Sequence, residues 1–358
     1  MVDFSSDEAR DVVFEQRGPI GIVTLSRPER KNALTEATYR QLRRRLEEWE
    51  LDRSVKAVVI RGSGGVFSSG GDLTWSVASV GAGAKGQPHA ARKAAFELVY
   101  GVQRQVKLYA KPYVALADGL AMGGGAGLLA HGQYRIGGDA LALAMPELAV
   151  GIVPDVGASF FLPHLPNRYG MHLGLTGARL DAADAMHAHL IDYYVRSERF
   201  DIVLDQLVEA DFSDGADEAI CEVLAMNASA PGAPSLKAHS REIEDAFDAS
   251  SLAEALSRLE AGSDWAREQA AIIRRQCPTA ALIAFELLKA PAEDVEAALI
   301  QEFRAIAFLT ARPDFAEGVK AVIKEKRAPN WLPATLDEVT EAAIAPAFAP
   351  PPGGDLRF

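Results

Sequence analysis

A run of glycines in the middle of the chain limits its possible folds more than any other feature. Gly123-Gly124-Gly125-Ala126-Gly127 follows an apolar segment of strand character, Tyr113 to Ala117, and leads into a helix-like segment, Ala126 to His131. At such a junction, unpaired backbone N–H groups precede the helix, and the helix dipole favours negative charge there. The sequence therefore predicts a turn lined with donors, although close packing between helix and strand would also explain the glycines.

The spacing of the glycines excludes two common nucleotide-binding motifs. No Lys-Ser or Lys-Thr pair follows the run, as it would in a P-loop. The glycines also do not follow the G-x-G-x-x-G pattern of a dinucleotide site.

Two carboxylates follow the glycine run within a short distance, each beside a proline. Glu147 comes directly after Pro146, and Asp155 directly after Pro154. Taken singly, each is explained most simply as a capping residue of a loop or helix. The alternative is a catalytic site, in which backbone N–H groups hold a carbonyl oxygen and a carboxylate attacks the carbonyl carbon.

The bulk composition is that of a globular protein with one or two domains. Of 358 residues, 49% are hydrophobic and 24% charged, and the formal net charge is −12. The negative charge argues against nucleic acid as a partner, and no apolar run predicts a membrane span. Two isolated cysteines, no metal-binding motif and an acidic start without targeting features predict a cytoplasmic protein without a metal site.

Local patterns predict several elements. The segments Val12–Glu15 and Ile20–Leu25 are predicted to form a β-hairpin. Thr35 is predicted to be the N-cap of a helix that carries Leu42, Leu46 and Trp49 on one face, and Leu252, Leu256 and Leu259 are spaced as one face of a later helix.

Alternating strand-like and helix-like segments predict an α/β fold. A Pro/Gly-rich linker at residues 227–234 separates a core (residues 1–226) from a helical region (residues 227–345), and residues 346–358 are predicted to form a flexible tail. Residues 77–89 are interpreted as a candidate lid. A basic turn with Arg27, Arg30 and Lys31 is either a solvated loop or a phosphate-contacting site.

Three segments, in order, resemble the signatures of the crotonase (enoyl-CoA hydratase/isomerase) superfamily. They are Arg27-Pro28 with Asn32-Ala33-Leu34, the loop from Gly62 to Leu73, and the stretch from Ala117 to Gly125. The resemblance covers about Val12 to Trp331. It implies a spiral core of ββα turns followed by a helical C-terminal region, an acyl-CoA substrate, and assembly into a homo-oligomer (a trimer or hexamer). It implies no cofactor, since coenzyme A is part of the substrate.

The resemblance also implies roles for individual residues. The backbone amides of Ser69 and Gly124 correspond to an oxyanion hole, which would stabilise a charge that develops only in the transition state. The positions implied to bind the substrate or its coenzyme A portion are Arg27, Lys31, Ala33, Leu34, Gly70, Gly71, Asp72, Gly123 and Gly127.

Within the superfamily, the carboxylates resemble the 3-hydroxyisobutyryl-CoA hydrolase branch. Hydratases use two glutamates, and the position of the first is here Gly127, which has no side chain. The hydrolase branch also has glycine there, and its Glu and Asp correspond to Glu147 and Asp155. One departure concerns the residues after Gly157, where the branch usually has two glycines and this chain has Ala158-Ser159.

The expected function is hydrolysis of a short 3-hydroxyacyl-CoA thioester, as in valine catabolism. Glu147 would act as nucleophile or as general base, and Asp155 would orient the substrate hydroxyl or share proton transfer. An enoyl-CoA hydratase or isomerase on the same fold is the nearest alternative. A non-catalytic CoA-binding module is an alternative from another class.

Overall fold

The computed structural model of the chain describes residues 11–72 and 89–358. The candidate lid therefore lies, apart from its last residue, outside the described residues. Contacts group the chain into two compact units built from separated segments. Unit 1 comprises Met1–Gly71, Gly101–Leu143 and Leu180–Ser235, and unit 2 comprises Asp72–Tyr100, Ala144–Arg179 and Leu236–Phe358.

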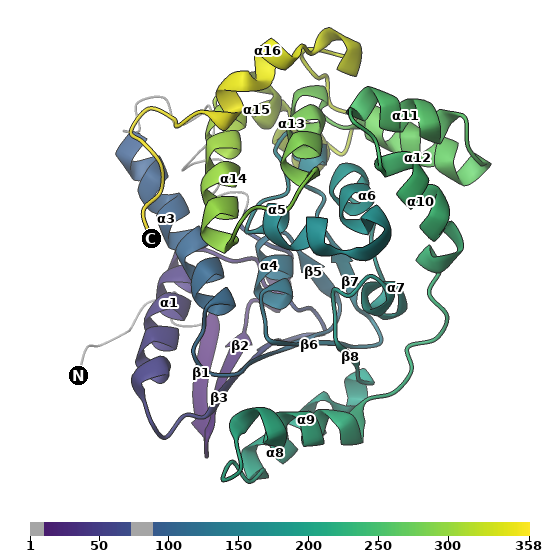
Figure 1. Ribbon diagram of the computed structural model, residues 1–358. Helices are drawn as coiled ribbons and strands as arrows, with labels where there is room; N and C mark the ends of the chain where they lie inside the picture. Colours follow the sequence, from purple (N-terminus) through teal and green to yellow (C-terminus); the bar gives the residue numbers. More distant parts are fainter. Residues whose placement is uncertain (1–10, 73–88) are drawn as a thin grey trace. The chain divides into compact units, whose positions relative to one another are not determined.

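A six-stranded sheet forms the centre of unit 1 (Figure 1). Its first two strands form the predicted antiparallel hairpin, and the remaining pairs are parallel. The central parallel strands are buried almost throughout, which explains their continuous apolar sequences. In spatial order the strands are β1 (Val12–Arg17), β2 (Ile20–Leu25), β3 (Ala57–Gly62), β4 (Tyr113–Ala117), β6 (Tyr134–Gly137) and β8 (Tyr193–Tyr194).

The helices of unit 1 cover this sheet with apolar stripes. Helix α1 (Glu36–Leu51) begins as predicted with Thr35 as N-cap, and it buries Leu42, Leu46 and Trp49. Helices α8 (Phe200–Glu209) and α9 (Ala216–Asn227) pack their buried faces against the strands in one hydrophobic cluster. A small second sheet joins β5 (Leu120–Met122) to β7 (Ala142–Ala144), and the remaining helices are α4 (Gly124–Ala130) and α7 (Ala182–His187).

Unit 2 is almost entirely helical, which confirms the helical C-terminal region. The predicted stripe of Leu252, Leu256 and Leu259 is buried. Its main helices are α6 (Tyr169–Thr176), α10 (Ser240–Phe247), α11 (Leu252–Glu260), α12 (Asp264–Arg275), α13 (Pro278–Leu288), α14 (Val295–Thr310) and α15 (Pro313–Gly318), and a π-helix follows at Val319–Glu325. Shorter elements are η3 (Glu147–Val150), α5 (Ala158–Phe161) and α16 (Glu341–Ile344), and α3 (His89–Lys107) contributes residues to both units.

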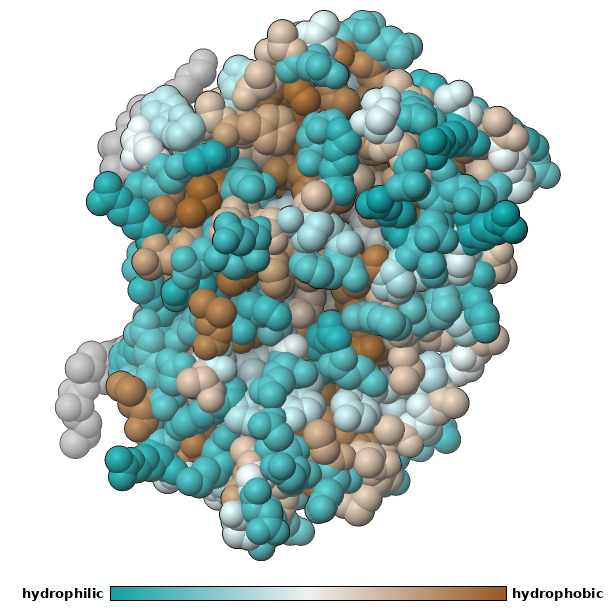
Figure 2. Space-filling model, viewed as in Figure 1, coloured by the Kyte–Doolittle hydropathy of each residue, from teal (hydrophilic) through white to brown (hydrophobic). Residues whose placement is uncertain are grey.

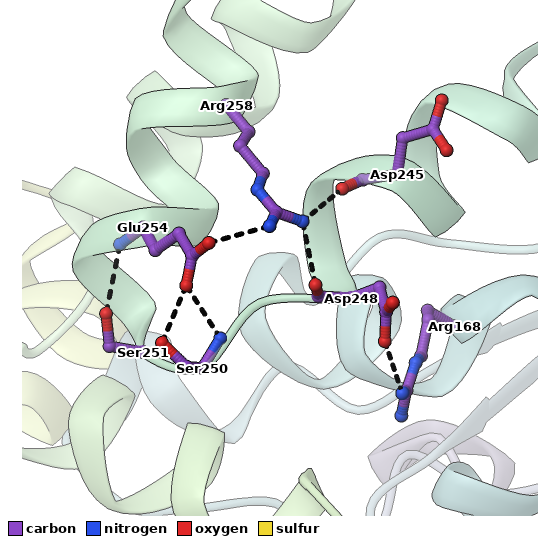
Figure 3. A network of polar contacts seen from close by, with 7 residues as sticks. All are labelled: Arg168, Asp245, Asp248, Ser250, Ser251, Glu254 and Arg258. Carbon is purple, nitrogen blue, oxygen red and sulfur yellow. Dashed lines mark hydrogen bonds and ion pairs between the residues drawn. The ribbon is translucent and has the colours of Figure 1, made fainter.

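An arginine joins the ends of two consecutive helices of unit 2 (Figure 3). Arg258 on α11 donates from Nη1 to the carbonyl oxygens of Asp245 and Asp248, both at 2.7 Å, at the C-terminal end of α10. Its Nη2 donates to Glu254, whose other carboxylate oxygen accepts from the backbone N–H of Ser250 at 2.8 Å. The guanidinium thereby satisfies carbonyl groups that the helix itself leaves unpaired.

The last residues do not form the flexible tail predicted from their Pro/Gly content. Asp355 accepts two hydrogen bonds from Arg304, from Nε at 2.8 Å and from Nη2 at 2.7 Å. Leu356 is buried. A partly buried bidentate ion pair and an apolar anchor hold this segment, and the Pro/Gly composition does not reveal either contact.

The visible surface in Figure 2 is mostly hydrophilic, with hydrophobic residues in small groups. No helix in the described part of the chain has the length and apolar character needed to cross a bilayer.

Candidate active site

Ser68 connects the glycine-rich loops of unit 1. Its backbone pairs with the strand before the glycine run, since the Ser68 N–H donates to the Leu120 carbonyl at 2.8 Å and the Met122 N–H donates to the Ser68 carbonyl at 3.0 Å. The Ser68 hydroxyl donates to the carbonyl oxygen of Asn32 at 2.8 Å and accepts from the Gly70 N–H at 3.2 Å. The basic turn and both glycine loops therefore meet at one residue.

Asn32 fixes the basic turn against the first glycine loop. Its buried side chain accepts from the Arg27 N–H at 2.8 Å and donates to the carbonyl oxygens of Ser63 at 3.0 Å and Val66 at 2.6 Å. Its backbone is left-handed, with φ of 52°, a conformation that asparagine tolerates better than most residues.

The prediction that the Ser69 amide is an oxyanion donor is wrong. That N–H already donates to the Lys31 carbonyl at 2.9 Å, which is a hydrogen bond that sequence comparison cannot detect. Within the described residues, the amides of Gly71 and Gly124 make no hydrogen bond. They lie in one neighbourhood, because a Cβ atom built on Gly124 would be 3.7 Å from the Gly71 nitrogen. Gly71 and Gly124 are therefore the candidate donor pair.

Backbone conformation explains why glycines precede both of these donors. Gly70 has φ of 92° and Gly123 has φ of 48°, both in the region that favours glycine. Gly124 is the first residue of α4, where its amide has no partner within the helix. The buried Gln103 donates from Nε2 to the Gly124 carbonyl at 3.0 Å and so holds the peptide that follows this amide. Gly127 lies within α4 and contributes no functional group.

The residues predicted to bind coenzyme A have different surroundings. Arg27 contacts Asp11 at 3.2 Å and donates to the Ala33 carbonyl at 3.0 Å, so its guanidinium also holds its own loop together. Lys31 is exposed, whereas Leu34 is fully buried and donates its N–H to the Gly70 carbonyl at 2.8 Å. Asp72 is the last residue before the undescribed segment and belongs to unit 2.

Glu147 is a buried carboxyl group of unit 2. It begins η3, which is packed through Val150 against Phe315 and Val319. Only 8% of Glu147 is exposed, and its Oε2 has no hydrogen-bond partner among the described residues. Burial raises its pKa well above the ordinary value, and the neighbouring Asp155 raises it further. A raised pKa makes the ionised form of this carboxyl group a stronger base, so Glu147 is a candidate nucleophile or general base.

Asp155 lies in the loop between η3 and α5 and is only partly buried. Its Oδ2 accepts a hydrogen bond from the Tyr100 hydroxyl at 2.9 Å. Burial raises the pKa of Asp155 to about 6, although the hydrogen bond from Tyr100 opposes the shift. The structure thus places both predicted carboxylates in one unit with coupled charges, and it adds Tyr100, which the sequence did not single out.

Glu302 is a third carboxylate, which sequence reasoning missed. It is fully buried on α14 and accepts hydrogen bonds from the N–H groups of Gly157 and Ser159 and from the Ser159 hydroxyl, each at 2.7 Å. Burial raises its pKa to about 8, with a further contribution from Asp155. One signal was available, because Glu302 occupies a position in the apolar stripe of α14.

The three carboxylates do not form a metal site in the geometry observed. Within residues 11–72 and 89–358, no group of three or more His, Cys, Asp or Glu side chains is arranged to hold an ion. The negative charge of one buried carboxylate raises the pKa of its neighbours. Residues of the same type can therefore differ in pKa, so that one acts as an acid and another as a base.

Comparison with protein families identifies the family to which the chain belongs. The family model described as enoyl-CoA hydratase/isomerase matches residues 20–348, so the chain belongs to the enoyl-CoA hydratase/isomerase family. The resemblance inferred from the three signature loops is thereby confirmed.

Relatives of known name point to one branch of this family. The chain is 34% identical to the mitochondrial 3-hydroxyisobutyryl-CoA hydrolase of Homo sapiens, covering 99% of this chain and 92% of that protein. It is 33% identical to the protein of the same name from Danio rerio, covering 99% and 93%.

Solved structures confirm the fold. A carnitinyl-CoA dehydratase from Mycobacterium thermoresistibile is 31% identical with a TM-score of 0.87, and the match covers 96% of this chain and 98% of that one. An enoyl-CoA hydratase from Rhodobacter sphaeroides is 32% identical with a TM-score of 0.87, covering 97% and 100%.

Proposed function

We propose that this chain hydrolyses a short 3-hydroxyacyl-CoA thioester, such as 3-hydroxyisobutyryl-CoA, to the free acid and coenzyme A. The observation that carries the proposal is Glu147, a buried carboxyl group with one unpaired oxygen and a raised pKa. Full-length similarity to relatives named 3-hydroxyisobutyryl-CoA hydrolase supports the choice of substrate.

In the proposed reaction, the amides of Gly71 and Gly124 donate to the thioester oxygen and stabilise the negative charge that it acquires. If Glu147 is the nucleophile, its oxygen bonds to the carbonyl carbon and the carbon–sulfur bond breaks. Coenzyme A leaves as a thiolate and takes up a proton. Water then cleaves the mixed anhydride and regenerates Glu147. If Glu147 is instead a base, it accepts a proton from the water that attacks the thioester.

Asp155 and Tyr100 are proposed to bind the hydroxyl group of the substrate. The Tyr100 hydroxyl occupies one oxygen of Asp155 and fixes the orientation of the carboxylate. The second oxygen is then available to accept a hydrogen bond. A binding site built for a hydroxyl group discriminates strongly against substrates that lack one, because its polar atoms are then left unpaired.

The substitution Glu147→Gln tests the proposal. It keeps the size of the side chain and removes both nucleophile and base, so thiol release should fall by about 100-fold or more. Release is followed with a thiol reagent, and binding of free coenzyme A is the control for folding. Near-normal thiol release would remove Glu147 from the mechanism.

The nearest alternative function is hydration or isomerisation of an enoyl-CoA on the same fold, as the names of two similar structures illustrate. Gly127 argues against it, since a side chain is missing where hydratases of this superfamily use a glutamate. Short 3-hydroxyacyl-CoA and enoyl-CoA substrates should be assayed for free thiol and for enoyl absorbance. Alkene loss without thiol release would favour the hydratase.

Isotope labelling separates the two roles of Glu147. In a single turnover in ¹⁸O-labelled water, attack of water on the Glu147 carbon of a mixed anhydride places the label in the Glu147 carboxylate, so label there demonstrates the anhydride. A general base leaves the peptide containing Glu147 unlabelled.

Phosphate contacts of coenzyme A are proposed for Arg27 and Lys31, with the remaining basic-turn and glycine-loop residues around them. A homo-oligomer, a trimer or hexamer, is proposed as well, and light scattering would measure its mass. A cytoplasmic location stays a prediction from the sequence, while the named relatives are mitochondrial.

A further inference from the structure

The loop that carries Asp155 has a strained backbone. Val156 has φ of 57°, a conformation that is rare for a β-branched residue because the side chain crowds its own backbone. Gly157 follows with φ of 88°, so two successive left-handed residues reverse the chain immediately after Asp155. The Val156 side chain is buried. A strained conformation persists only where surrounding contacts impose it.

Glu302 supplies such contacts. Its Oε2 accepts from the Gly157 N–H, and its Oε1 accepts from both the N–H and the hydroxyl of Ser159, each at 2.7 Å. All three partners are donors, so both oxygens of the Glu302 carboxyl group act as acceptors. The three bonds hold the chain on the C-terminal side of Val156.

A second contact, from Tyr100, holds the Asp155 side chain itself. The hydroxyl of Tyr100 donates to its Oδ2, and Phe96, one helical turn earlier on α3, contacts both Tyr100 and Phe303 through ring edges. Phe303 directly follows Glu302 in sequence. Helix α14 therefore contacts the Asp155 loop through Glu302. Through Phe303 it also contacts Phe96, which packs against Tyr100.

We infer that Glu302 is a positioning residue that, with the hydroxyl of Ser159, holds the left-handed turn after Asp155 and so orients Asp155 toward the substrate. The inference rests on the proposed hydrolase function. Ser159 is a residue in which this chain departs from the glycine expected at that position. Glu302 has no direct role in bond making or breaking.

Two substitutions separate positioning from simple stabilisation. Glu302→Gln replaces one acceptor oxygen with an NH₂ group, which faces an N–H donor and weakens the turn. Ser159→Ala removes only the hydroxyl and leaves both amide contacts. We expect kcat for thiol release to fall about 100-fold in the first variant and about fivefold in the second, with KM changed less than about threefold.

The matched control is Thr310→Val on the same helix. Thr310 is buried and its hydroxyl donates to the Ile306 carbonyl, so the substitution removes a buried polar contact of α14 away from the Asp155 loop. The expected result is a lowered melting temperature with an unchanged kcat. If Thr310→Val lowers kcat as much as Ser159→Ala at a similar melting temperature, the effect is structural and the inference fails.

The double variant Glu302→Gln/Ser159→Ala completes the cycle. If the hydroxyl acts through the carboxylate, the double variant has the kcat of Glu302→Gln alone. Multiplicative losses would overturn the inference. If Glu302→Gln does not fold, the comparison of Ser159→Ala with Thr310→Val decides.

The outcome is distinguishable from failure of the proposed function. Should Glu147→Gln abolish thiol release while both Glu302→Gln and Ser159→Ala stay within about threefold of the original kcat, only the positioning inference is lost. Should Glu147→Gln retain full activity, the hydrolase mechanism itself is lost.

Discussion

At residue 124 a single methyl group would disturb both packing and chemistry. A Cβ atom there would overlap the Tyr39 hydroxyl and enter the space beside the Gly71 nitrogen. We expect Gly124→Ala to destabilise the fold by about 1–3 kcal/mol and to reduce thiol release about 100-fold. Thermal unfolding and steady-state kinetics measure the two effects separately.

The control for this variant is the additional substitution Tyr39→Phe, which removes the overlapping hydroxyl. It should restore part of the stability but little of the activity, since the methyl group still occupies the space near the donors. Recovery of full activity would show that the loss came from the overlap with the Tyr39 hydroxyl and not from a methyl group beside the donors.

The raised pKa of Asp155 predicts a second residue-level effect, on stability against pH. The pKa rises from an ordinary value of 3.8 to about 6 in the fold because of burial. A group of this kind stabilises the fold below its unfolded pKa, and this contribution is lost as the pH rises through the folded pKa. Above about pH 6 the ionised Asp155 therefore destabilises the protein.

Asp155→Asn should accordingly raise stability by about 2 kcal/mol at about pH 8 and by almost nothing at about pH 4. Denaturant unfolding at both pH values measures the difference. Equal effects at the two pH values would contradict a raised pKa. The variant should also have lower thiolesterase activity, as expected for a functional residue that costs stability.

The sequence located the candidate carboxylates of the site better than it located the candidate backbone donors. Glu147 and Asp155 could be named because each follows a proline in a recognisable motif. Ser69 was a wrong choice of donor, because the choice depends on a hydrogen bond to Lys31 that forms only in the fold. Glu302 was missed because it lies 145 residues from Gly157 in sequence. Its polar character on an otherwise apolar helix face is the signal that could have revealed it.

Among the elements, the corner between α10 and α11 depends on one guanidinium (Figure 3). Arg258 pairs with two carbonyl oxygens at the end of α10 and with Glu254 on its own helix. Because the side chain is partly exposed, we expect Arg258→Ala to cost only about 1 kcal/mol. Differential scanning calorimetry would detect the lower melting temperature.

A comparison variant, Arg241→Ala, removes an exposed i,i+4 ion pair on α10 with a distance of 3.6 Å. It should have almost no effect, since exposed pairs of this kind contribute little. Equal losses in the two variants would mean that the carbonyl contacts of Arg258 add nothing.

Elements with local signals were predicted correctly, and elements defined by distant contacts were not. Thr35 and the apolar stripe of α1 are encoded within one helix, and the β1–β2 hairpin within a few residues. The end of the chain lacks any such local signal. Its order comes from Arg304, about fifty residues earlier in the sequence.

At the scale of the whole molecule, both compact units are discontinuous in sequence. Residues 144–179, which carry Glu147 and Asp155, group with the C-terminal helices, although they were assigned to the core on sequence. The predicted boundary at residue 226 lies inside α9, close to the contact boundary at Ser235. Linear composition locates linkers, but it does not show which segments return to an earlier part of the fold.

The C-terminal segment provides the last prediction. Deletion of the residues after Pro350 removes the bidentate partner of Arg304 and the buried Leu356. We expect a loss of about 3 kcal/mol, because the apolar burial disappears and a partly buried guanidinium is left without its carboxylate. Asp355→Asn, which removes only the charge, should cost about 1 kcal/mol. Since Arg304 lies two residues after Glu302 on α14, the truncated protein should also lose thiolesterase activity at temperatures where α14 begins to loosen. An unchanged melting temperature in the truncated protein would mean that the segment is as loose as its composition suggested.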